Sequence, residues 1–324
     1  MLNSHGAEEK VAIVLATYNP KCQYFLKQIE SIKQQTWQNF ICYIVDDNSA
    51  SACKDKMLKL VGDDSRFICL FHDSNLGSYH NFERGLNYCL LNSAVTAIAF
   101  CDQDDVWHTN KIELLIKSLR SSGALVAHSD LVLIDEEDKV VANSCWDYEG
   151  RTPENTTSRV LLIRNTVTGC AMMFRSSLLS KVLPFPKQDK IYWHHDHWVA
   201  IIAAELGKIE HIREPLINYR QHANNSLGAQ KTANGVVDEL SAWKVNKFRV
   251  SGNSYLVSKN FCTAFYERLN LKRKNPFDLR VFDFGLGILL LGINCFLSKN
   301  RGLGSTLRLV TIKVLLLFNV IKRN

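Results

Sequence analysis

The sequence has few of the residues that interrupt regular structure: only 6 Pro and 16 Gly occur among 324 residues. The hydrophobic share is 46% and the charged share is 22%. These values exclude a collagenous, low-complexity or largely disordered chain. A chain of this length forms two domains, or one large α/β domain with an appended segment.

Closely spaced cysteine pairs are also missing. The ten cysteines include no Cys-x-x-Cys, and the two closest, Cys42 and Cys53, are 11 residues apart. Most lie among apolar neighbours, where a free cysteine behaves as a small buried hydrophobe. The first ten residues lack the basic start and the apolar stretch of a signal peptide. We therefore expect a reduced, cytosolic chain.

Glycine-rich phosphate loops are absent as well. No Gly-x-Gly-x-x-Gly follows the first predicted strand, and no Gly-Lys-Ser/Thr occurs anywhere. A Rossmann dinucleotide site and a P-loop need these glycines, because the backbone must approach the phosphates closely. Both classes of site are excluded.

Charge is distributed unevenly along the chain. The whole sequence carries +7, but residues 244–324 hold 15 Lys and Arg against 3 Asp and Glu, a net charge of +12. Residues 1–243 hold 24 Lys and Arg against 29 Asp and Glu, a net charge of −5. A basic tail thus follows a mildly acidic body.

Two apolar stretches lie in the basic tail, at residues 284–298 and 309–321. Both are shorter than the about 20 residues that span a bilayer. With basic residues around them, they predict helices that lie on an anionic membrane surface. A packed helical subdomain is the alternative. Nucleic acid is not expected as a partner, because the basic residues interleave with long aliphatic runs.

The first third of the chain alternates short β-branched runs with segments of helix length. Strands are predicted at residues 11–17, 41–46, 67–72 and 97–102, with helices near 22–35, 50–60 and 78–92. This rhythm predicts a parallel sheet covered by helices. Ligands of such sheets bind beyond the carboxyl ends of the strands.

The rhythm changes after residue 123. Strands are predicted at 125–129, 131–135, 139–141 and 168–174, then a helix within 191–206 and an extended piece at 215–222. Because short strands follow one another without intervening helices, this half is expected to be mixed or antiparallel.

A polar segment follows each of the first four predicted strands, and the fourth is Asp102-Gln103-Asp104-Asp105. Carboxylates at a phosphate-binding edge repel their ligand unless a divalent cation lies between them. Asp102, Asp104 and Asp105 therefore predict a Mg²⁺ or Mn²⁺ site. The alternative is a solvated turn, with Asp105 as the N-cap of a helix at 111–120.

Seven short segments, in order, resemble known glycosyltransferases. Four are typical of family 2: Leu15-Ala16-Thr17-Tyr18-Asn19, Ile44-Val45-Asp46-Asp47-Asn48-Ser49, Asn75-x-Gly77-x-x-x-Asn81-Phe82 and Asp102-Gln103-Asp104-Asp105-Val106-Trp107. Three more are similar to its rhamnosyltransferase-like branch: Thr168-Gly169-Cys170, His195-Asp196-His197-Trp198 and Tyr219-Arg220-Gln221-His222-Ala223-Asn224-Asn225. The resemblance covers about residues 10–228.

The resemblance implies an α/β fold of GT-A (Rossmann-like) type, a mixed sheet flanked by helices. We expect this domain at residues 1–235, with a donor half at about 10–122 and an acceptor half at about 123–228. A helical, basic, membrane-associating extension is expected at residues 236–324.

The resemblance also implies a nucleotide-sugar donor at the strand ends. Tyr18 would stack on a pyrimidine, Asp47 would accept N3–H of uracil or thymine, and Asp46 or Asp102 would accept ribose hydroxyls. The complete expected nucleotide set is Thr17, Tyr18, Asn19, Asp46, Asp47, Asn75, Asn81 and Asp102. Metal ligands are expected at Asp104, Asp105 and His222, where the cation bridges the diphosphate. A surface loop is the alternative for His222.

Enzymes of this kind invert the anomeric centre, which requires a base opposite the leaving group. Asp196 is the expected catalytic base, since the positive end of a helix keeps a carboxylate ionised there. The sugar and acceptor are expected against Trp107, Thr168, Gly169, Cys170, Trp193, His195 and Trp198. The alternatives are an N-cap aspartate with two core tryptophans, and a strand bulge at Gly169.

The run His194-His195-Asp196-His197 also suggests a zinc site. His194 and His197 stand three residues apart and can share a helix face. A catalytic zinc needs three protein ligands of suitable geometry, so packed or hydrogen-bonded histidines are expected instead.

The predicted activity is inverting, metal-dependent transfer of a sugar. The preferred prediction for that sugar is L-rhamnose from a dTDP donor. The acceptor would be a lipid-linked cell-surface polysaccharide or O-antigen intermediate, at the inner face of the cytoplasmic membrane. Only the branch resemblance selects rhamnose, and a UDP-hexose donor is the alternative. A nucleotidyltransferase would need a glycine-rich basic loop, which residues 17–20 lack. A non-catalytic glycan-binding protein would not need both the aspartate cluster and Asp196.

Overall fold

The computed structural model describes residues 9–154, 156–162, 165–188, 193–222, 229 and 260–272. The chain divides into two compact units. The first comprises Met1–Cys145, Val167–Lys187 and His194–Gly228, and the second comprises Trp146–Thr166, Gln188–Trp193 and Ala229–Asn324. Each predicted site residue except Trp193 belongs to the first unit. The predicted domain boundary at residue 235 lies outside the described residues and remains a prediction.

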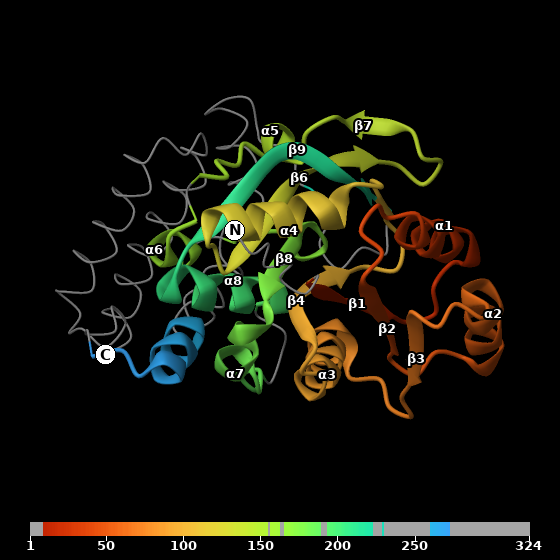
Figure 1. Cartoon of the computed structure of the whole chain (residues 1–324), viewed down its shortest axis with the longest axis horizontal. Coiled ribbons are helices and arrows are strands. Elements are labelled where there is room, and N and C mark those ends of the chain that lie inside the picture. Colours follow the sequence, from red (N-terminus) through yellow and green to blue (C-terminus); the bar gives the residue numbers. More distant parts are fainter. Residues whose placement is uncertain are drawn as a thin grey trace, which may run out of the picture. The chain divides into compact units, whose positions relative to one another are not determined.

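The first unit is built on one mixed sheet (Figure 1). Its strands lie in the order β3 (Phe67–Phe71), β2 (Phe40–Asp46), β1 (Lys10–Thr17), β4 (Val95–Cys101), β8 (Met172–Arg175), β6 (Val126–Ile134), β9 (Ile209–Arg220) and β5 (Val106–Trp107), and β7 (Val140–Ala142) pairs with β6. The strands β1 to β4 are parallel, whereas β8 is antiparallel to both of its neighbours. The predicted parallel half and mixed half are confirmed.

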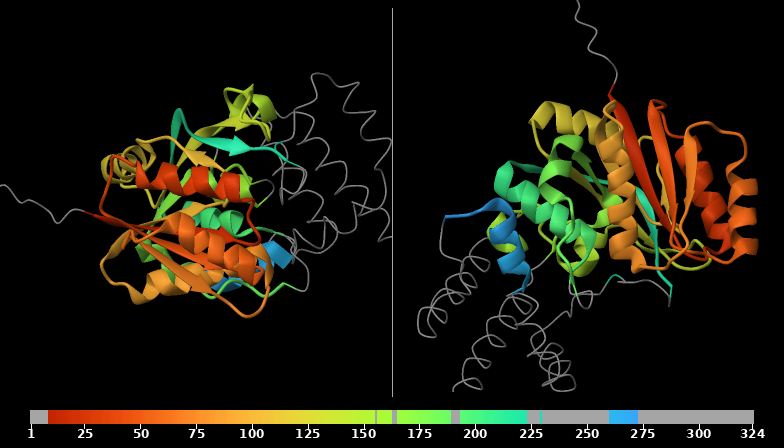
Figure 2. Two further views of the ribbon diagram at one scale, coloured as in Figure 1. Left: turned by 90° about the vertical axis from the view of Figure 1, so that its right-hand side faces the viewer. Right: turned by 90° about the horizontal axis from the view of Figure 1, so that it is seen from below.

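Helices connect the strands and cover the sheet (Figure 2). The longer ones in the first unit are α1 (Cys22–Lys33), α2 (Ser51–Val61), α3 (Gly77–Leu91), α4 (Lys111–Ser122) and α8 (His195–Leu206). Short helical pieces are α5 (Cys145–Glu149), α6 (Ser158–Leu161), η1 (Gly169–Ala171), η2 (Ser176–Leu178) and α7 (Leu179–Val182). The predicted helices near 22–35, 50–60, 78–92 and 111–120 are therefore confirmed.

The central strand β1 explains why the parallel half forms. Val11 to Leu15 are five consecutive apolar residues, and all are fully buried. A strand that is covered on both faces reads as a continuous apolar run rather than an alternating one. On one of these faces α3 packs closely, since a Cβ added at Gly85 would lie only 2.2 Å from Val14 Cγ1. Glycine at this position allows the helix to approach the strand.

The strand register brings the site residues to one edge. Thr17 at the end of β1 pairs with Asp46 at the end of β2, and Leu15 pairs with Cys101, which directly precedes Asp102. Because β1, β2 and β4 are parallel, their carboxyl ends meet at the same edge. The polar segments that follow these strands therefore lie together, as the sequence predicts.

Four strands differ from the prediction. The segment predicted as a strand at 168–174 contains the turn η1 and only Met172–Arg175 forms β8, and β9 begins at Ile209, earlier than the predicted 215. Val126–Ile134 form the single strand β6, although a break was expected at Asp130. This carboxylate is buried, and it accepts hydrogen bonds from Leu131 N (2.8 Å) and Ser144 Oγ (2.5 Å). Paired in this way, Asp130 does not end the strand. The short strand β5 was not predicted, because its two residues are defined by pairing with β9, more than a hundred residues away.

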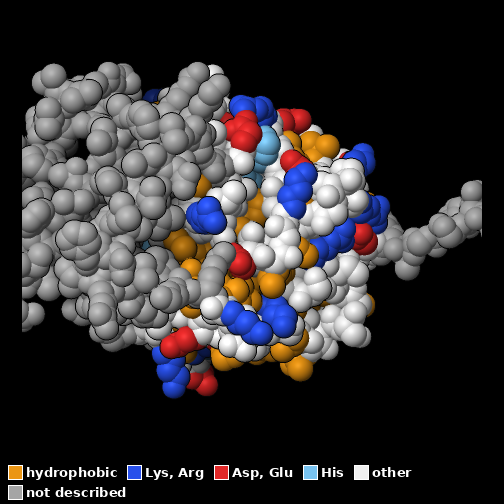
Figure 3. All heavy atoms as spheres, turned by 90° about the vertical axis from the view of Figure 1, so that its left-hand side faces the viewer, with side chains coloured by type: hydrophobic (Ala, Val, Ile, Leu, Met, Phe, Trp, Pro, Cys, Tyr) orange, Lys and Arg blue, Asp and Glu red, His pale blue; other side chains and the backbone are white. Residues whose placement is uncertain are grey.

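Little of the basic tail is described. Residues 260–269 form a helix in the second unit, in agreement with the predicted helical character of that stretch. The apolar stretches at 284–298 and 309–321 lie outside the described residues. Among the residues that the structure describes, none belongs to a helix long and apolar enough to cross a membrane. On the described part of the face in Figure 3, Lys and Arg side chains lie among acidic and apolar ones.

Candidate active site

The loop after β1 presents Tyr18 at the carboxyl edge. The Tyr18 side chain is 50% exposed. Its backbone is held from the loop after β4: the Tyr18 N–H donates to Gln103 Oε1 (2.8 Å), and Gln103 Nε2 donates to the Tyr18 carbonyl (3.3 Å). Asn19 connects to the loop after β2, because its Oδ1 accepts from Ala50 N at 3.0 Å. Tyr18 is thus an exposed ring on a fixed backbone, which suits stacking on a base.

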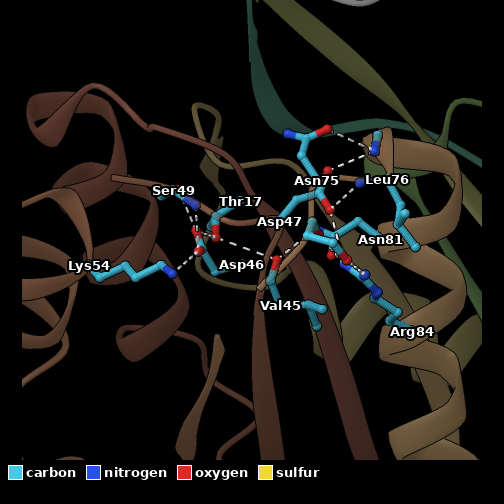
Figure 4. Close-up of polar contacts among 12 residues, drawn as sticks. Thr17, Val45, Asp46, Asp47, Ser49, Lys54, Asn75, Leu76, Asn81 and Arg84 are labelled. Atoms are coloured by element: carbon cyan, nitrogen blue, oxygen red, sulfur yellow. Dashed lines mark hydrogen bonds and ion pairs between the residues drawn. The ribbon is translucent and has the colours of Figure 1, made fainter. Parts of the chain in front are cut away.

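Asp46 lies at the end of β2 and is fully buried (Figure 4). Its carboxylate accepts hydrogen bonds from Ser49 N (2.9 Å), Ser49 Oγ (2.5 Å) and Thr17 Oγ1 (3.2 Å). Lys54 Nζ lies 3.9 Å from it. The predicted contact of Asp46 and Thr17 with a nucleotide is not supported, because both side chains are buried and bonded to each other. Between the two predicted ribose acceptors, the structure favours the partly exposed Asp102.

Asp47 is bonded to the turn that begins α3 (Figure 4). Oδ1 accepts from Leu76 N (2.9 Å) and Arg84 Nη1 (3.0 Å), and Oδ2 accepts from Gly77 N (2.8 Å). A carboxylate offers about four lone-pair positions. Three are occupied, so one remains for the predicted N3–H contact with a base.

The two asparagines of this segment differ in their surroundings. Asn75 is exposed, and its Oδ1 accepts from Gly77 N at 3.2 Å. Asn81 is buried on α3, and its Nδ2 donates to the Val45 carbonyl at 2.7 Å (Figure 4). The predicted contact of Asn81 with the sugar-nucleotide donor is not supported, since its side chain is buried and its amide donates to the end of β2.

The loop after β4 is held by the end of β9. Arg220 is fully buried, and its N–H donates to Asp105 Oδ1 at 3.0 Å. Arg220 Nε donates to the Asp104 carbonyl (2.9 Å), and the guanidinium lies 4.2 Å from the centre of the Tyr24 ring. Two residues further on, His222 Nε2 lies 2.8 Å from Asp104 Oδ2. The structure therefore pairs Asp104 with His222 and bonds Asp105 to the backbone of Arg220, and the metal-binding role of the three residues remains a prediction.

A second group of possible metal ligands combines two aspartates of this loop with Cys170 of η1. One ligand atom from each of Asp102, Asp105 and Cys170 lies within 4.8 Å of the others. Burial and the neighbouring carboxylates Asp104 and Asp196 raise the pKa of Asp102 to about 7. Burial, together with Asp104 and Asp102, raises the pKa of Asp105 well above its usual value. Burial likewise raises the pKa of the Cys170 thiol, so this sulfur is a thiol rather than a thiolate ligand.

The residues of this loop fit a hard divalent cation. Asp105 Oδ2 is buried and accepts no N–H or O–H hydrogen bond, and the neighbour of this carboxylate is the Cys170 thiol. Neighbouring buried carboxylates repel one another, and a cation between them removes that repulsion. The partly exposed pair Asp104 and His222 adds an oxygen and a nitrogen ligand that a substrate can reach. When bound there, a divalent cation supplies positive charge to a diphosphate.

Asp196 lies in the first turn of α8, as predicted. Its Oδ2 accepts from Gly169 N at 3.0 Å, and its Oδ1 accepts from His197 N at 2.6 Å. The contact with Gly169 is tight, because an added Cβ would lie 3.2 Å from Asp196 Cβ and 2.9 Å from His195 Nε2. A glycine at position 169 therefore allows the turn to pack against Asp196, and its contact with a sugar remains a prediction. Asp196 is partly exposed, and its negative charge contributes to the raised pKa of Asp102.

His195 is a packed histidine. Its ring stacks on Phe82 with centroids 3.7 Å apart, and it meets Phe100 edge-on at 4.6 Å. Burial lowers the pKa of His195 to about 4, so the imidazole is neutral. The zinc alternative gains no support, since the clusters of possible ligands in the described residues do not include these histidines.

The tryptophans do not form an exposed sugar platform. Trp198 is fully buried, and its indole N–H donates to the Val182 carbonyl at 2.9 Å. Trp107 is buried beneath Lys111. Trp193 belongs to the second unit, where its ring centre lies 5.1 Å from that of Phe261. The predicted sugar contacts of Trp107 and Trp198 are corrected to core packing. Thr168 is partly exposed and Cys170 is buried, and their contacts with sugar remain predictions.

Four polar residues of the site escaped sequence reasoning: Gln103, Arg84, Lys111 and Arg220. Gln103 and Arg220 lie inside the recognised motifs, Gln103 between two aspartates and Arg220 two residues before His222, but neither was assigned a role. Lys111 is the first residue of α4 and Trp107 belongs to the strand β5, so no helical spacing relates the two in the sequence. Arg84 gave no signal, because an arginine in an amphipathic helix usually reads as a solvated side chain.

The chain belongs to glycosyl transferase family 2, whose family model matches residues 12–180. An uncharacterised glycosyltransferase of Nostoc sp. is 27% identical over 311 residues, which cover 90% of this chain and 91% of that protein. The E. coli WfaP protein, a UDP-Glc:alpha-D-GlcNAc-diphosphoundecaprenol beta-1,3-glucosyltransferase, is 28% identical over 187 residues, 57% of this chain and 69% of that protein. The chain spans less than half the length of two longer Rickettsia relatives.

Solved structures share the fold. The structure of S. aureus TarS 1–349 in complex with UDP-GlcNAc matches with a TM-score of 0.54 and 12% sequence identity, covering 94% of this chain and 90% of that one. At this identity the likeness concerns the fold alone. The mixed sheet flanked by helices is therefore a GT-A fold, as the sequence predicts.

Proposed function

We propose that this chain transfers a sugar from a uridine or thymidine diphosphate donor to a hydroxyl group of a lipid-linked glycan, with inversion at the anomeric carbon. One observation carries the proposal: Asp196 accepts a hydrogen bond from Gly169, and a ligand atom of the next residue, Cys170, lies within 4.8 Å of one from Asp102, at the edge where Tyr18 is exposed. A base, a ribose acceptor and a stacking ring are thus gathered at one place.

The donor end is bound by the residues that remain accessible. Tyr18 stacks on the base, and the partly exposed Asp102 accepts from the ribose. The remaining lone pair of Asp47 distinguishes uracil and thymine, which carry N3–H, from cytosine. Asp104 and His222 would hold a Mg²⁺ or Mn²⁺ ion, which would supply positive charge to the departing diphosphate. Asp105 is fully buried and accepts a hydrogen bond from Arg220 N, which fixes the loop that carries the cation ligands.

Asp196 acts as the general base in this proposal. Two backbone amides, those of Gly169 and His197, fix its carboxylate and stabilise its negative charge. A free lone pair of the Asp196 carboxylate accepts the proton of the acceptor hydroxyl. The hydroxyl oxygen then bonds to the anomeric carbon while the bond from that carbon to the diphosphate breaks. Attack on the face opposite the diphosphate inverts the configuration.

Two donors are favoured by separate observations. UDP-glucose is favoured because two E. coli relatives carry it in their names, one of them at 28% identity. The same names supply a lipid-diphosphate acceptor class, and a location at the membrane surface follows from such a substrate. dTDP-L-rhamnose is favoured by the segments at 168–170, 195–198 and 219–225, which resemble the rhamnosyltransferase-like branch.

Calorimetric titration of the full chain tests the proposal. UDP and dTDP are titrated with and without Mn²⁺, and CDP, whose base lacks N3–H, is the matched control. We expect binding of UDP or dTDP that Mn²⁺ strengthens at least tenfold, with CDP much weaker. Transfer from UDP-glucose and dTDP-L-rhamnose to a short-chain lipid diphosphate-GlcNAc then identifies the sugar. Absence of metal-dependent binding to either nucleotide contradicts the proposal.

A further inference from the structure

Lys111 is a buried cation at the first residue of α4. Its side chain is fully buried, and its Nζ lies 3.5 Å from the centre of the Trp107 ring. The ammonium donates to the Cys170 carbonyl at 2.5 Å. It also interacts electrostatically with Asp105 and Asp102. A buried ammonium is costly unless charges and hydrogen bonds compensate it. Here the compensation comes from the donor-binding loop and from the turn at Cys170.

The turn that Lys111 holds is also the turn that holds Asp196. Cys170 belongs to η1 (Gly169–Ala171), and the Gly169 N–H of the same turn donates to Asp196 Oδ2 at 3.0 Å. The turn cannot slide toward α8, since Gly169 already lies against His195 and Asp196 without room for a Cβ. Two hydrogen bonds in series therefore connect Lys111 to the carboxylate of Asp196.

The other end of this connection is equally fixed. Lys111 lies four residues after the end of the Asp102–Trp107 segment, and Trp107 N donates to Ser31 Oγ at 3.0 Å. The N–H of Ile112, the next residue in α4, donates to Gln35 Oε1 at 3.0 Å. The backbone on either side of Lys111 is therefore fixed by hydrogen bonds to α1 and to Gln35, and its ammonium contacts the turn η1 that bonds Asp196.

We propose that Lys111 is a positioning residue: through the Cys170 carbonyl and the Gly169 amide it fixes Asp196 relative to the donor-binding carboxylates. The inference rests on the proposed function. Transfer needs the acceptor oxygen, held at Asp196, to meet an anomeric carbon whose place is set by the diphosphate at Asp102–Asp105. A small shift between these two groups lowers the rate of transfer without weakening the binding of the donor.

The test replaces Lys111 by Met, which keeps the length of the side chain and removes its charge and its donor. Full-length Lys111→Met is assayed for transfer from UDP-glucose to a lipid diphosphate-GlcNAc acceptor, and for binding of UDP with Mn²⁺. We expect kcat to fall 10- to 100-fold while the Kd of UDP with Mn²⁺ changes by threefold or less. Lys117→Met is the matched control, because Lys117 lies on the same helix with an exposed side chain.

A double variant separates positioning from general structural damage. If Lys111 acts through Asp196, Lys111→Met has little further effect in an Asp196→Asn background. The inference is overturned if Lys111→Met lowers the residual rate of Asp196→Asn by its full factor, or if the Kd for UDP rises in parallel with the loss of kcat.

Gly169→Ala provides a second route if Lys111→Met does not fold. The added Cβ displaces the turn from Asp196 at the other end of the same connection, so the same loss of kcat with unchanged UDP binding is expected. A wild-type protein that binds neither UDP nor dTDP contradicts the proposed function. A wild-type protein that binds and transfers, with unaffected Lys111→Met or Gly169→Ala variants, contradicts only the role of Lys111.

Discussion

At the residue scale, the aspartates of the site differ in what already bonds their oxygens. Asp46 and Asp47 accept hydrogen bonds from Thr17, Ser49 and the turn at the start of α3, and both are buried. Asp102 and Asp196 are partly exposed. Asp46 shapes the loops, Asp47 also shapes them and keeps one lone pair for the proposed base contact, and the second pair is available to a substrate. Residue type alone does not separate these two uses, whereas bonding and exposure do.

Replacing Asp196 by Asn tests its role as base. The amide keeps the shape of the side chain but cannot take a proton from the acceptor hydroxyl. We expect kcat to fall by about 10²- to 10⁴-fold, the usual contribution of a general base. Binding of UDP with Mn²⁺, measured by calorimetry, should change less than threefold. A variant with wild-type turnover shows that another group is the base.

Replacing Tyr18 by Ala tests the stacking contact. The ring is half exposed and its backbone is fixed by Gln103, so its removal leaves the loop in place. Stacking of a base on an aromatic ring contributes about 1–3 kcal/mol, so we expect a rise of about 5- to 150-fold in the Kd for UDP. Tyr18→Phe keeps the ring and should bind UDP as the wild type does. Equal loss in both variants would point to the hydroxyl instead.

The buried ring of His195 predicts acid sensitivity. Burial holds its pKa at about 4, against 6.5 in the unfolded chain. Between these values the unfolded state binds a proton that the folded state does not, so stability falls as pH decreases from 6.5 to 4. At pH 5 this single group costs about 2 kcal/mol of unfolding free energy.

Urea unfolding at pH 7 and pH 5 measures this cost. His195→Gln, which does not titrate, should lose about 2 kcal/mol less than the wild type between the two pH values. An identical pH dependence in both proteins would show that the imidazole is protonated in the folded state as well.

At the scale of elements, the sequence predicts what is local and misses what depends on distant partners. The apolar runs of β1 to β4 and the amphipathic helices between them are evident without a structure. The bonding state of the site is not: Arg84 reaches Asp47 across 37 positions, Lys111 reaches Cys170 across 59, and Arg220 reaches Asp105 across 115. Only the packed fold shows that Arg84 pairs with the Asp47 carboxylate, that the Lys111 ammonium donates to a backbone carbonyl and that the backbone N–H of Arg220 donates to Asp105.

The packing of α3 on β1 gives a prediction for an element. An added Cβ at Gly85 would lie 2.2 Å from Val14 Cγ1, so Gly85→Ala must push the helix from the sheet. Overpacking of this kind costs about 1–3 kcal/mol of unfolding free energy. Asn87→Ala, at an exposed position of the same helix, should change the stability by less than about 0.5 kcal/mol. Urea unfolding of both variants checks this, and equal stability would show that α3 adjusts freely.

At the scale of the whole molecule, net charge separates the catalytic body from the tail. Residues 1–243 carry −5 and residues 244–324 carry +12. The body holds the aspartates of the site, while the basic tail carries the apolar stretches of the sequence. A lipid-linked acceptor is held at a membrane, so a tail that binds anionic lipid would bring the site to its substrate. This role of the tail is a prediction from the sequence alone.

Vesicle binding of the full chain tests the tail. Near an anionic surface each Lys or Arg contributes about 1 kcal/mol, and salt screens the attraction. We expect binding to vesicles with 30% phosphatidylglycerol at 50 mM salt, and weaker binding at 500 mM salt or to neutral vesicles. The double variant Lys272→Gln/Lys274→Gln should bind about 30-fold less tightly. The control Lys56→Gln/Lys59→Gln, with exposed lysines of the body, should bind like the wild type. Equal binding of neutral and anionic vesicles, or equal losses in both variants, would show that the tail charge does not direct the protein to membranes.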